Sequence, residues 1–186
     1  MISINVRADI RRVTRNLRLS RKQIGAMARR AINKAGKMNQ TAMARDVSKL
    51  TSLRVTKVKA DMILRSAQGN DLGRMFSRLK SRRAPQKLSY FTRPTQTARG
   101  VMVTAWGVRK LYQNTFLATM DSGHVGIFSR AKRGEKRVGR IPLHELHGPE
   151  IPETMALREV MDRARARSSE IFIKELRRLA AMEIGR

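Results

Sequence analysis

The chain has 186 residues and a formal net charge of +27, because 41 Lys and Arg stand against 14 Asp and Glu. Self-repulsion on this scale destabilises an isolated compact monomer, so a polyanion or acidic protein neighbours are the expected surroundings. The absence of cysteine excludes disulfide scaffolds, thiolate metal sites and cysteine nucleophiles. The length suits one domain spanning residues 1–186.

The N-terminal sequence becomes polar within a few residues, and no run of about 18 apolar residues occurs in the chain. We therefore expect neither a signal peptide nor contact with a membrane. The chain is expected to be made in a cytoplasm and to stay there, or in a particle assembled there.

Residues 1–19 are predicted to form a basic arm. Within it, residues 2–6 alternate apolar and polar side chains as a short edge strand does, and residues 7–19 are either a short basic helix or a segment that orders on contact. Ser20 has the side chain of an N-cap, because its hydroxyl can accept a hydrogen bond from a free backbone N–H.

A long helix is predicted over residues 21–50. Apolar side chains recur there at intervals of three and four, as a core-facing stripe requires: Ile24, Met27, Ala28, Ala31, Ile32, Ala35, Met38, Ala42, Met43, Val47 and Leu50. Small and flexible side chains on this face would allow close approach of a sheet or of a helix from another subunit. We therefore predict a subunit interface that includes Met27, Ala31 and Ala35.

A second helix is predicted over residues 56–63, with the hydroxyl of Thr56 as its cap. Two successive helices also occur in helix-turn-helix DNA readers. This pair lacks a clear recognition face, however, and an all-basic helix that contacts phosphates reads no sequence. A plain helical hairpin is the favoured interpretation. Strands are then predicted over residues 63–67 and 72–80.

The middle of the chain is predicted to contain one clear strand. Residues 81–97 hold two prolines and several arginines and are predicted to be an exposed extended loop or an excursion at a sheet edge. Residues 100–108 are rich in valine and form the strand. Trp106 is predicted to be a core or interface anchor, because no neighbouring aromatics form the series that stacks on single strands, and we include it in the predicted subunit interface. Residues 111–120 are predicted to be an apolar loop or a short helix.

Residues 123–152 are the part of the sequence in which strand, turn and proline signals lie closest together. Strands are predicted over residues 124–129 and 138–143, and residues 130–140 form the extended basic tip of a hairpin. We predict that this tip contacts a polyanion, although a solvated turn is the alternative. The predicted contact residues are Arg130, Lys132, Arg133, Lys136 and Arg137.

The last predicted element is an amphipathic helix that runs to about residue 182. Pro152 suits its first turn, and the helix should pack along the sheet and beside the first long helix. The predicted fold class is therefore α+β. A long N-terminal helix and a C-terminal amphipathic helix pack on a mostly antiparallel sheet that carries a basic hairpin.

No residue pattern supports an enzyme. His144, Glu145 and His147 are one residue short of the H-E-x-x-H zinc motif, and Gly148 follows at once. With His124 as a third ligand a zinc site is conceivable, but ordinary hydrogen-bonding histidines are favoured. No catalytic triad or phosphate-binding glycine loop is evident. We predict no catalytic residue, no metal and no cofactor.

Four segments resemble the minor tail protein Z, or tail completion, family of siphophages. They are TKVKADMI after the long helix, TFLATMDSGHVGIFSR, RIPLHELHGPEIP and the terminal amphipathic helix, and the order of elements matches over nearly the whole chain. The resemblance implies a non-enzymatic virion protein, assembled in the host cytoplasm, that completes the head-proximal end of the tail for head–tail joining.

The resemblance also implies neighbours in the virion. The expected partners are further copies in a ring, expected to be a hexamer, together with tail terminator, tail tube and head–tail connector proteins. The basic surface would face genomic DNA or acidic neighbours. The alternative is a nonspecific nucleic-acid-binding protein of nucleoid or ribosomal type, whose affinity would fall steeply with salt.

Overall fold

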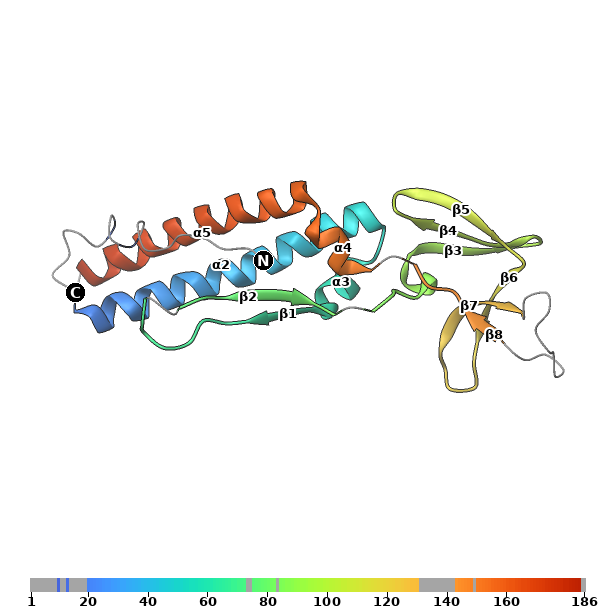
Figure 1. Cartoon of the computed structure of the whole chain (residues 1–186), viewed down its shortest axis with the longest axis horizontal. Coiled ribbons are helices and arrows are strands. Elements are labelled where there is room, and N and C mark those ends of the chain that lie inside the picture. Colours follow the sequence, from blue (N-terminus) through green and yellow to red (C-terminus); the bar gives the residue numbers. More distant parts are fainter. Residues whose placement is uncertain are drawn as a thin grey trace. The chain divides into compact units, whose positions relative to one another are not determined.

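The long helix predicted from the sequence is present as α2, Arg21–Thr51 (Figure 1). Its first turn is closed by a reciprocal pair of hydrogen bonds. The backbone N–H of Gln23 donates to Oγ of Ser20 at 3.3 Å, and the backbone N–H of Ser20 donates to Oε1 of Gln23 at 2.9 Å. This is a capping box, which satisfies two backbone donors that the helix leaves free. The predicted helix and its N-cap are confirmed.

A computed structural model describes residues 10, 13, 20–72, 75–82, 84–130, 143–148 and 150–184. The chain divides into two compact units. The helical unit comprises Met1–Ala44, Met62–Ser81 and Met155–Arg186, and the sheet unit comprises Arg45–Asp61 and Arg82–Thr154. The single domain expected from the chain length stays a prediction.

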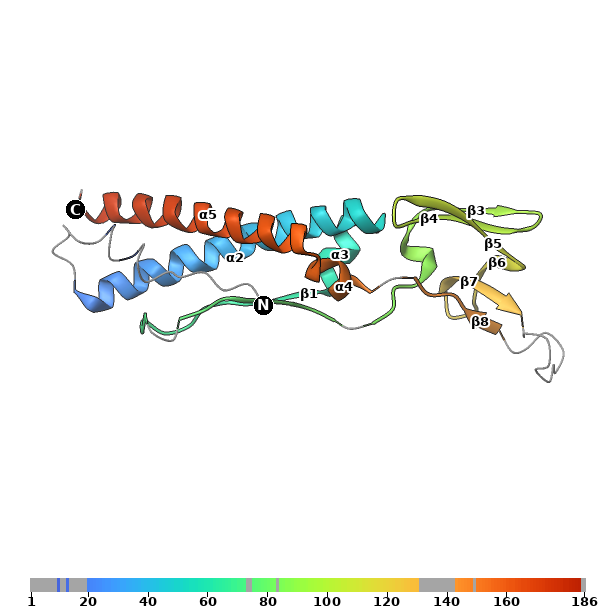
Figure 2. The same cartoon turned by 45° about the horizontal axis from the view of Figure 1, so that its top comes forward.

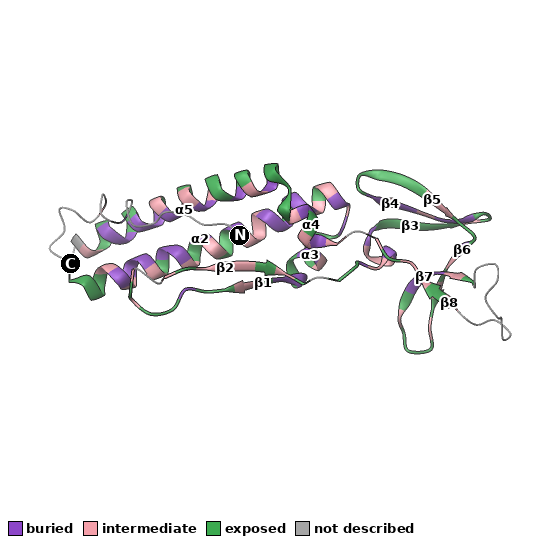
Figure 3. Cartoon of the chain, viewed as in Figure 1, coloured by how far each residue is buried: buried purple, intermediate pink, exposed green. Residues whose placement is uncertain are grey.

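The helical unit is built on α2 and α5, Arg158–Ile184. The two helices run side by side and antiparallel in both views (Figures 1 and 2). Apolar side chains of both helices form one buried cluster together with Ile10 and Ala67, and Figure 3 shows buried positions along both helices. Its members are Ile10, Met27, Ala28, Ala31, Ile32, Ala35, Ala67, Phe172, Leu176, Leu179 and Ala180. The predicted packing of the last helix beside the first is confirmed.

The C-terminal helix is interrupted near its start. α4, Ile151–Ala156, contains Pro152 in its first turn as predicted, and Leu157 separates it from α5. The sequence predicts one continuous helix here. Its apolar spacing continues across Leu157, so it gives no sign of the interruption.

A short hairpin completes the helical unit. β1, Met62–Arg65, pairs antiparallel with β2, Arg78–Ser81. The Asn33 side chain of α2 holds the segment after β1, because its Nδ2 donates to the carbonyl of Ala67 at 3.1 Å and its Oδ1 accepts from the N–H of Ala67 at 2.7 Å. The two predicted strands are present, and the second is shorter than predicted.

The sheet unit begins with the last turns of α2 and with α3, Val55–Asp61. The predicted second helix is therefore present but ends before residue 62, because Met62 and Ile63 pair in β1. A 3-10 turn, η1, follows at Leu88–Tyr90, and two three-stranded antiparallel sheets complete the unit. Their orders are β3-β4-β5 and β6-β7-β8, with bounds Thr92–Thr97, Gly100–Ala105, Val108–Gln113, Thr115–Thr119, Val125–Arg130 and Leu143–Glu145.

Of the two alternatives predicted for residues 81–97, the second half of the segment is a sheet edge and not an exposed loop. Leu88 and Phe91 are fully buried, and β3 pairs with β4. Phe91 forms an isolated antiparallel bridge with Leu53, which follows α2. Pro94, one of the residues that suggested a loop, lies in an edge strand, where a missing N–H is tolerated.

The loop or helix predicted over residues 111–120 is also wrong. This stretch contains the end of β5 and all of β6, joined through Asn114, whose φ is 56°. The strand predicted over residues 100–108 is confirmed as β4 but ends at Ala105, where a tight turn begins. The α+β class is confirmed, and the strands of the described residues lie in three small antiparallel sheets.

Several predicted elements fall outside the described residues. They are the strand over residues 2–6, most of the basic arm and all but Arg130 of the hairpin tip over residues 130–140. The predicted strand over residues 124–129 is confirmed as β7. Of the predicted strand over residues 138–143, only Leu143 is described, and β8 begins there and pairs with β7.

Candidate functional site

Of the five predicted polyanion-contact residues, the structure describes only Arg130. Arg130 is exposed at the end of β7, and its guanidinium carbon lies 5.8 Å from the centre of the Phe116 ring. That distance suits a cation–π contact. Lys132, Arg133, Lys136 and Arg137 lie outside the described residues. Contact of this group with a polyanion stays a prediction.

The predicted interface residues have different surroundings. Met27, Ala31 and Ala35 are 3%, 0% and 4% exposed, and they belong to the cluster that α2 shares with α5 of the same chain. Trp106 is 46% exposed, so it is not the core anchor that the sequence allowed. A role of these four residues in subunit contact stays a prediction.

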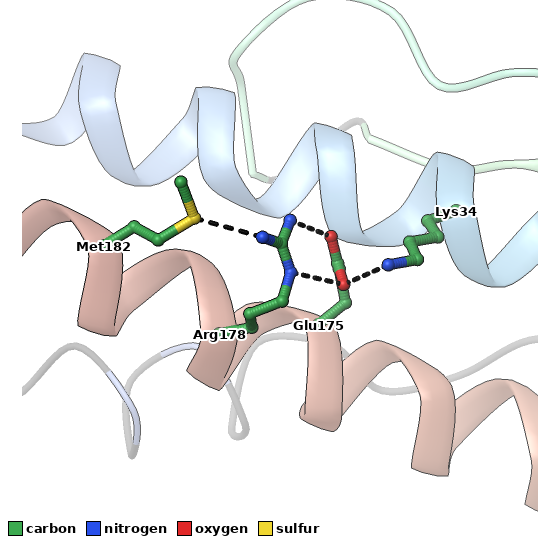
Figure 4. Close-up of polar contacts among 4 residues, drawn as sticks. All are labelled: Lys34, Glu175, Arg178 and Met182. Atoms are coloured by element: carbon green, nitrogen blue, oxygen red, sulfur yellow. Dashed lines mark hydrogen bonds and ion pairs between the residues drawn. The ribbon is translucent and has the colours of Figure 1, made fainter.

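A polar cluster links α2 to α5 beside their apolar contact (Figure 4). Nζ of Lys34 lies 2.6 Å from Oε2 of Glu175. Arg178, one turn further along α5, donates from Nη2 to Oε1 of Glu175 at 2.7 Å and from Nε to Oε2 at 3.0 Å. The fork of Arg178 thus holds both carboxylate oxygens, which is the geometry that makes such pairs strong.

These contacts keep Glu175 ionised. The hydrogen bonds from Arg178 lower the pKa of Glu175, and those from Lys34 add to them against the opposing effect of burial, so that the pKa falls from 4.5 to about 2. Arg178 also donates from Nη1 to Sδ of Met182 at 3.0 Å. The cluster connects the two helices, and both carboxylate oxygens of Glu175 accept hydrogen bonds within it.

A second polar cluster lies in the sheet unit. Nζ of Lys87 is 3.0 Å from Oε2 of Glu145, and Nε2 of His124 is 2.8 Å from Oε1 of Glu145. Burial alone would raise the pKa of Glu145, but hydrogen bonds from Lys87 and His124 outweigh it, so that the pKa lies below its ordinary value. The cluster joins the segment before β7, β8 and the segment before η1.

The histidines do not converge on a metal. His144 and Glu145 are successive residues of β8, so their side chains leave opposite faces of the strand. Nδ1 of His147 lies 3.1 Å from the backbone carbonyl oxygen of Glu145, and Glu145 itself is engaged as described. Within the described part of the chain, no group of three or more His, Asp or Glu side chains has metal-binding geometry.

The turn between β4 and β5 presents an aromatic side chain under strain. Ala105 pairs with Val108, and the two residues between them, Trp106 and Gly107, have φ of 55° and 71°. Positive φ at both positions defines a type I′ turn, whose usual sequence is Asn-Gly. A left-handed conformation costs roughly 1–2 kcal/mol at a residue with a side chain, and a bulky residue there is rare.

Two hydrogen bonds fix this turn to the end of α2. The N–H of Trp106 donates to the carbonyl of Thr51 at 3.1 Å, and the N–H of Gly107 donates to Oγ of Ser52 at 3.1 Å. Ser52 also accepts from the N–H of Thr92 in β3 at 3.1 Å. The backbone of the turn is therefore held rigidly while the indole stays half exposed.

The basic residues of α2 line its exposed side. Arg30, Lys37, Arg45 and Lys49 are exposed and are separated by four, seven or eight residues, so they share one face of the helix, whereas the charge of Lys34 is paired with Glu175. The single acidic residue of α2, Asp46, is 8% exposed and lies off this face. The face therefore carries positive charge along most of the helix.

A surface pocket in the sheet unit adds to this charge. It has a volume of about 330 Å³ and is lined by Arg54, Thr56, Lys57, Ser89 and Tyr90. Nζ of Lys57 bonds Oδ1 of the buried Asp61 at 3.3 Å, whereas Arg54 has no ion-pair partner in the described part of the chain. The pocket is open to solvent, and Arg54 gives it a positive charge.

Comparison with protein families decides the relationship. The family model described as prophage minor tail protein Z matches residues 10–179 of this chain. The chain belongs to the prophage minor tail protein Z family. The match covers both units and includes the basic face of α2, the two polar clusters and the turn at Trp106.

Membership of the minor tail protein Z family makes the chain a phage minor tail protein, from a family of structural tail proteins. This confirms the family indicated by sequence resemblance and favours it over a nucleoid or ribosomal protein. No curated protein and no solved structure matched the chain. Among the described residues, no helix is both long and apolar enough to cross a membrane.

Sequence reasoning missed most of the polar contacts in this minor tail protein. Lys34 and Glu175 are 141 residues apart, and Lys87 and Glu145 lie on segments with no common motif. The spacing of Glu175 and Arg178 by three residues in a helix was a readable signal for one ion pair. The strained turn was not readable, because the dipeptide Trp-Gly is not a usual type I′ sequence.

Proposed function

We propose that this minor tail protein completes the head-proximal end of the phage tail and allows the tail to join a head. The subunits form a closed ring there, as the resemblance implies, and contact tail tube, tail terminator and head–tail connector proteins. The basic surface faces DNA in the tail channel or acidic neighbours. The observation that carries the proposal is the positive charge that the chain does not neutralise by itself.

The acidic side chains are too few to neutralise the charge of the basic ones, and several of them are already paired within the chain. The 14 Asp and Glu of the chain can neutralise no more than 14 of the positive charges on its 41 Lys and Arg. Glu145 and Glu175 are held by intrachain cations, and so is the buried Asp61. The remaining cations repel one another in an isolated subunit, and an assembly that contains polyanions or acidic proteins relieves this repulsion.

A ring around a DNA channel suits this charge. Closed cyclic symmetry presents the same basic face from every subunit toward one axis, so the charges add around the channel. Lys and Arg that neutralise phosphates release counterions and bind without reading sequence. Arg30 and Lys37 on α2 are suited to this role, because both are exposed and neither has an ion-pair partner among the described residues.

A joining assay tests the proposal. Particles produced without this chain should accumulate as separate filled heads and tails, and adding the purified chain should restore joined particles. The charge-reversal variant R30E/K37E should restore few joined particles, whereas the matched variant R30K/K37R, which keeps both charges, should restore them fully. Normal joining in the absence of the chain would disprove the proposed function.

A further inference from the structure

The β4–β5 turn of the sheet unit has the properties of a docking device. We infer that Trp106 and Val108 insert into an apolar pocket rimmed by carboxylates on a different, acidic protein of the tail. This inference rests on membership of the minor tail protein family and does not require the head-proximal location proposed above.

The first observation is the combination of strain, rigidity and exposure. Trp106 adopts φ of 55° in a turn that asparagine would occupy with less strain, and its N–H is bonded to the carbonyl of Thr51. Trp106 is nevertheless 46% exposed and Val108 is 65% exposed. The intrachain contacts therefore do not account for a tryptophan at this position, whereas burial against a partner would.

The second observation is the charge around the turn. Arg109 and Lys110 directly follow Val108 in β5, which is an edge strand of its sheet, and both are exposed. No Asp or Glu occurs anywhere between Asp71 and Asp121, so the whole β3–β4–β5 sheet carries no acidic side chain. A partner face rimmed by carboxylates would complement this surface.

The same charge argues against a second copy of the chain pairing through this sheet, because like charges would then face each other. Nucleic acid is also a poorer fit. Nonspecific stacking on single strands uses several aromatic side chains in series, and Tyr112 is the one other aromatic residue of this sheet. A second exposed apolar side chain, that of Val108 two residues after Trp106, favours an apolar pocket on a protein.

The variant W106N separates this role from a structural one. Asparagine is preferred at this turn position, so the variant should fold with an unchanged or higher melting temperature. It should still lose most of its affinity for the partner, because a buried tryptophan is the typical anchor of a protein interface. A purely structural tryptophan would give the opposite result, a lower melting temperature. W106G serves the same purpose if W106N does not fold, since glycine adopts the same φ.

The binding probe is a preparation of phage tails assembled without this chain. Labelled wild-type chain should co-sediment with these tails, and W106N should bind about 30-fold more weakly or worse. The matched control is R93N, which changes another exposed residue with positive φ in the same sheet and should bind within about threefold of wild type. R109E/K110E should bind weakly, and the affinity of wild type should fall as salt is raised.

Three results would overturn the inference. The first is equal binding of W106N and wild type to the tails. The second is a parallel loss of affinity for duplex or single-stranded DNA in W106N, which would make nucleic acid the ligand. The third is a change in the oligomeric state of W106N in the absence of tails, which would make a second copy of the chain the partner.

Discussion

Replacing Glu175 by glutamine tests how much the polar tie between α2 and α5 contributes to folding. The pKa of Glu175 falls from 4.5 to about 2 in the folded chain. Since one pKa unit corresponds to about 1.4 kcal/mol, the charged contacts of Glu175 contribute at most about 3.5 kcal/mol. Lys34 and Arg178 are 48% and 52% exposed, so water screens both contacts, and we expect E175Q to lower the free energy of unfolding by about 1–2 kcal/mol.

The pH dependence of this loss has a definite sign. The folded pKa of Glu175 is depressed, so its stabilising effect is fully present above the ordinary carboxyl pKa near 4.5 and disappears as the pH falls toward 2. The difference between wild type and E175Q should therefore be constant from pH 7 to about pH 5 and shrink below that.

Urea unfolding followed by circular dichroism at pH 7, 5 and 3, at constant ionic strength, measures both quantities. Glu170, an exposed carboxylate on the same helix, provides the control, and E170Q should change stability by less than about 0.5 kcal/mol. If E175Q is as stable as wild type at pH 7, or if its deficit is the same at pH 3, the account of this cluster is wrong.

Three further variants test other contacts by the same unfolding assay. S20A removes the hydroxyl that caps α2 and should cost about 1 kcal/mol; no loss would mean that the cap is unimportant. G25A should lower the free energy of unfolding by about 1–3 kcal/mol although alanine favours helices, because the added Cβ would meet the backbone oxygen of Asn70. G36A should lower it less, because the Cβ there would meet the side chain of Ser77, which can move. E145Q should lower stability by about 1–2 kcal/mol at pH 7, with a deficit that disappears as Glu145 is protonated on acidification; a deficit that grows in acid would contradict the pKa direction.

The helices were largely predictable from the sequence because their information is local. The three- and four-residue spacing of apolar side chains in residues 21–50, together with the hydroxyl of Ser20, predicts α2 nearly to the residue. Gly25 illustrates the limit of local reasoning. The low helix propensity of glycine can be read from the sequence. The reason why a glycine is needed at position 25 cannot, because it is the close approach of Asn70, which lies in a hairpin more than 40 residues away.

The strands between residues 81 and 120 were mostly not predictable. Tyr112, Phe116 and Met120 recur every four residues and so imitate a helical stripe, whereas a break at Asn114 divides them between β5 and the β6 region. Leu88 and Phe91 lie in a stretch rich in basic residues and proline, and they are buried because of pairing with distant segments. The same holds for the polar clusters, whose members come together only in the folded chain.

Locating the chain in assembled particles tests the proposed function most directly. A gold-labelled antibody against the chain, or a tag on its C-terminus, can be imaged by electron microscopy on intact phage and on free tails. We predict label only at the tail end that joins the head, with several copies at that position. Label along the tail tube, label at the opposite tip or its absence from finished particles would contradict a role in completing the tail for head joining.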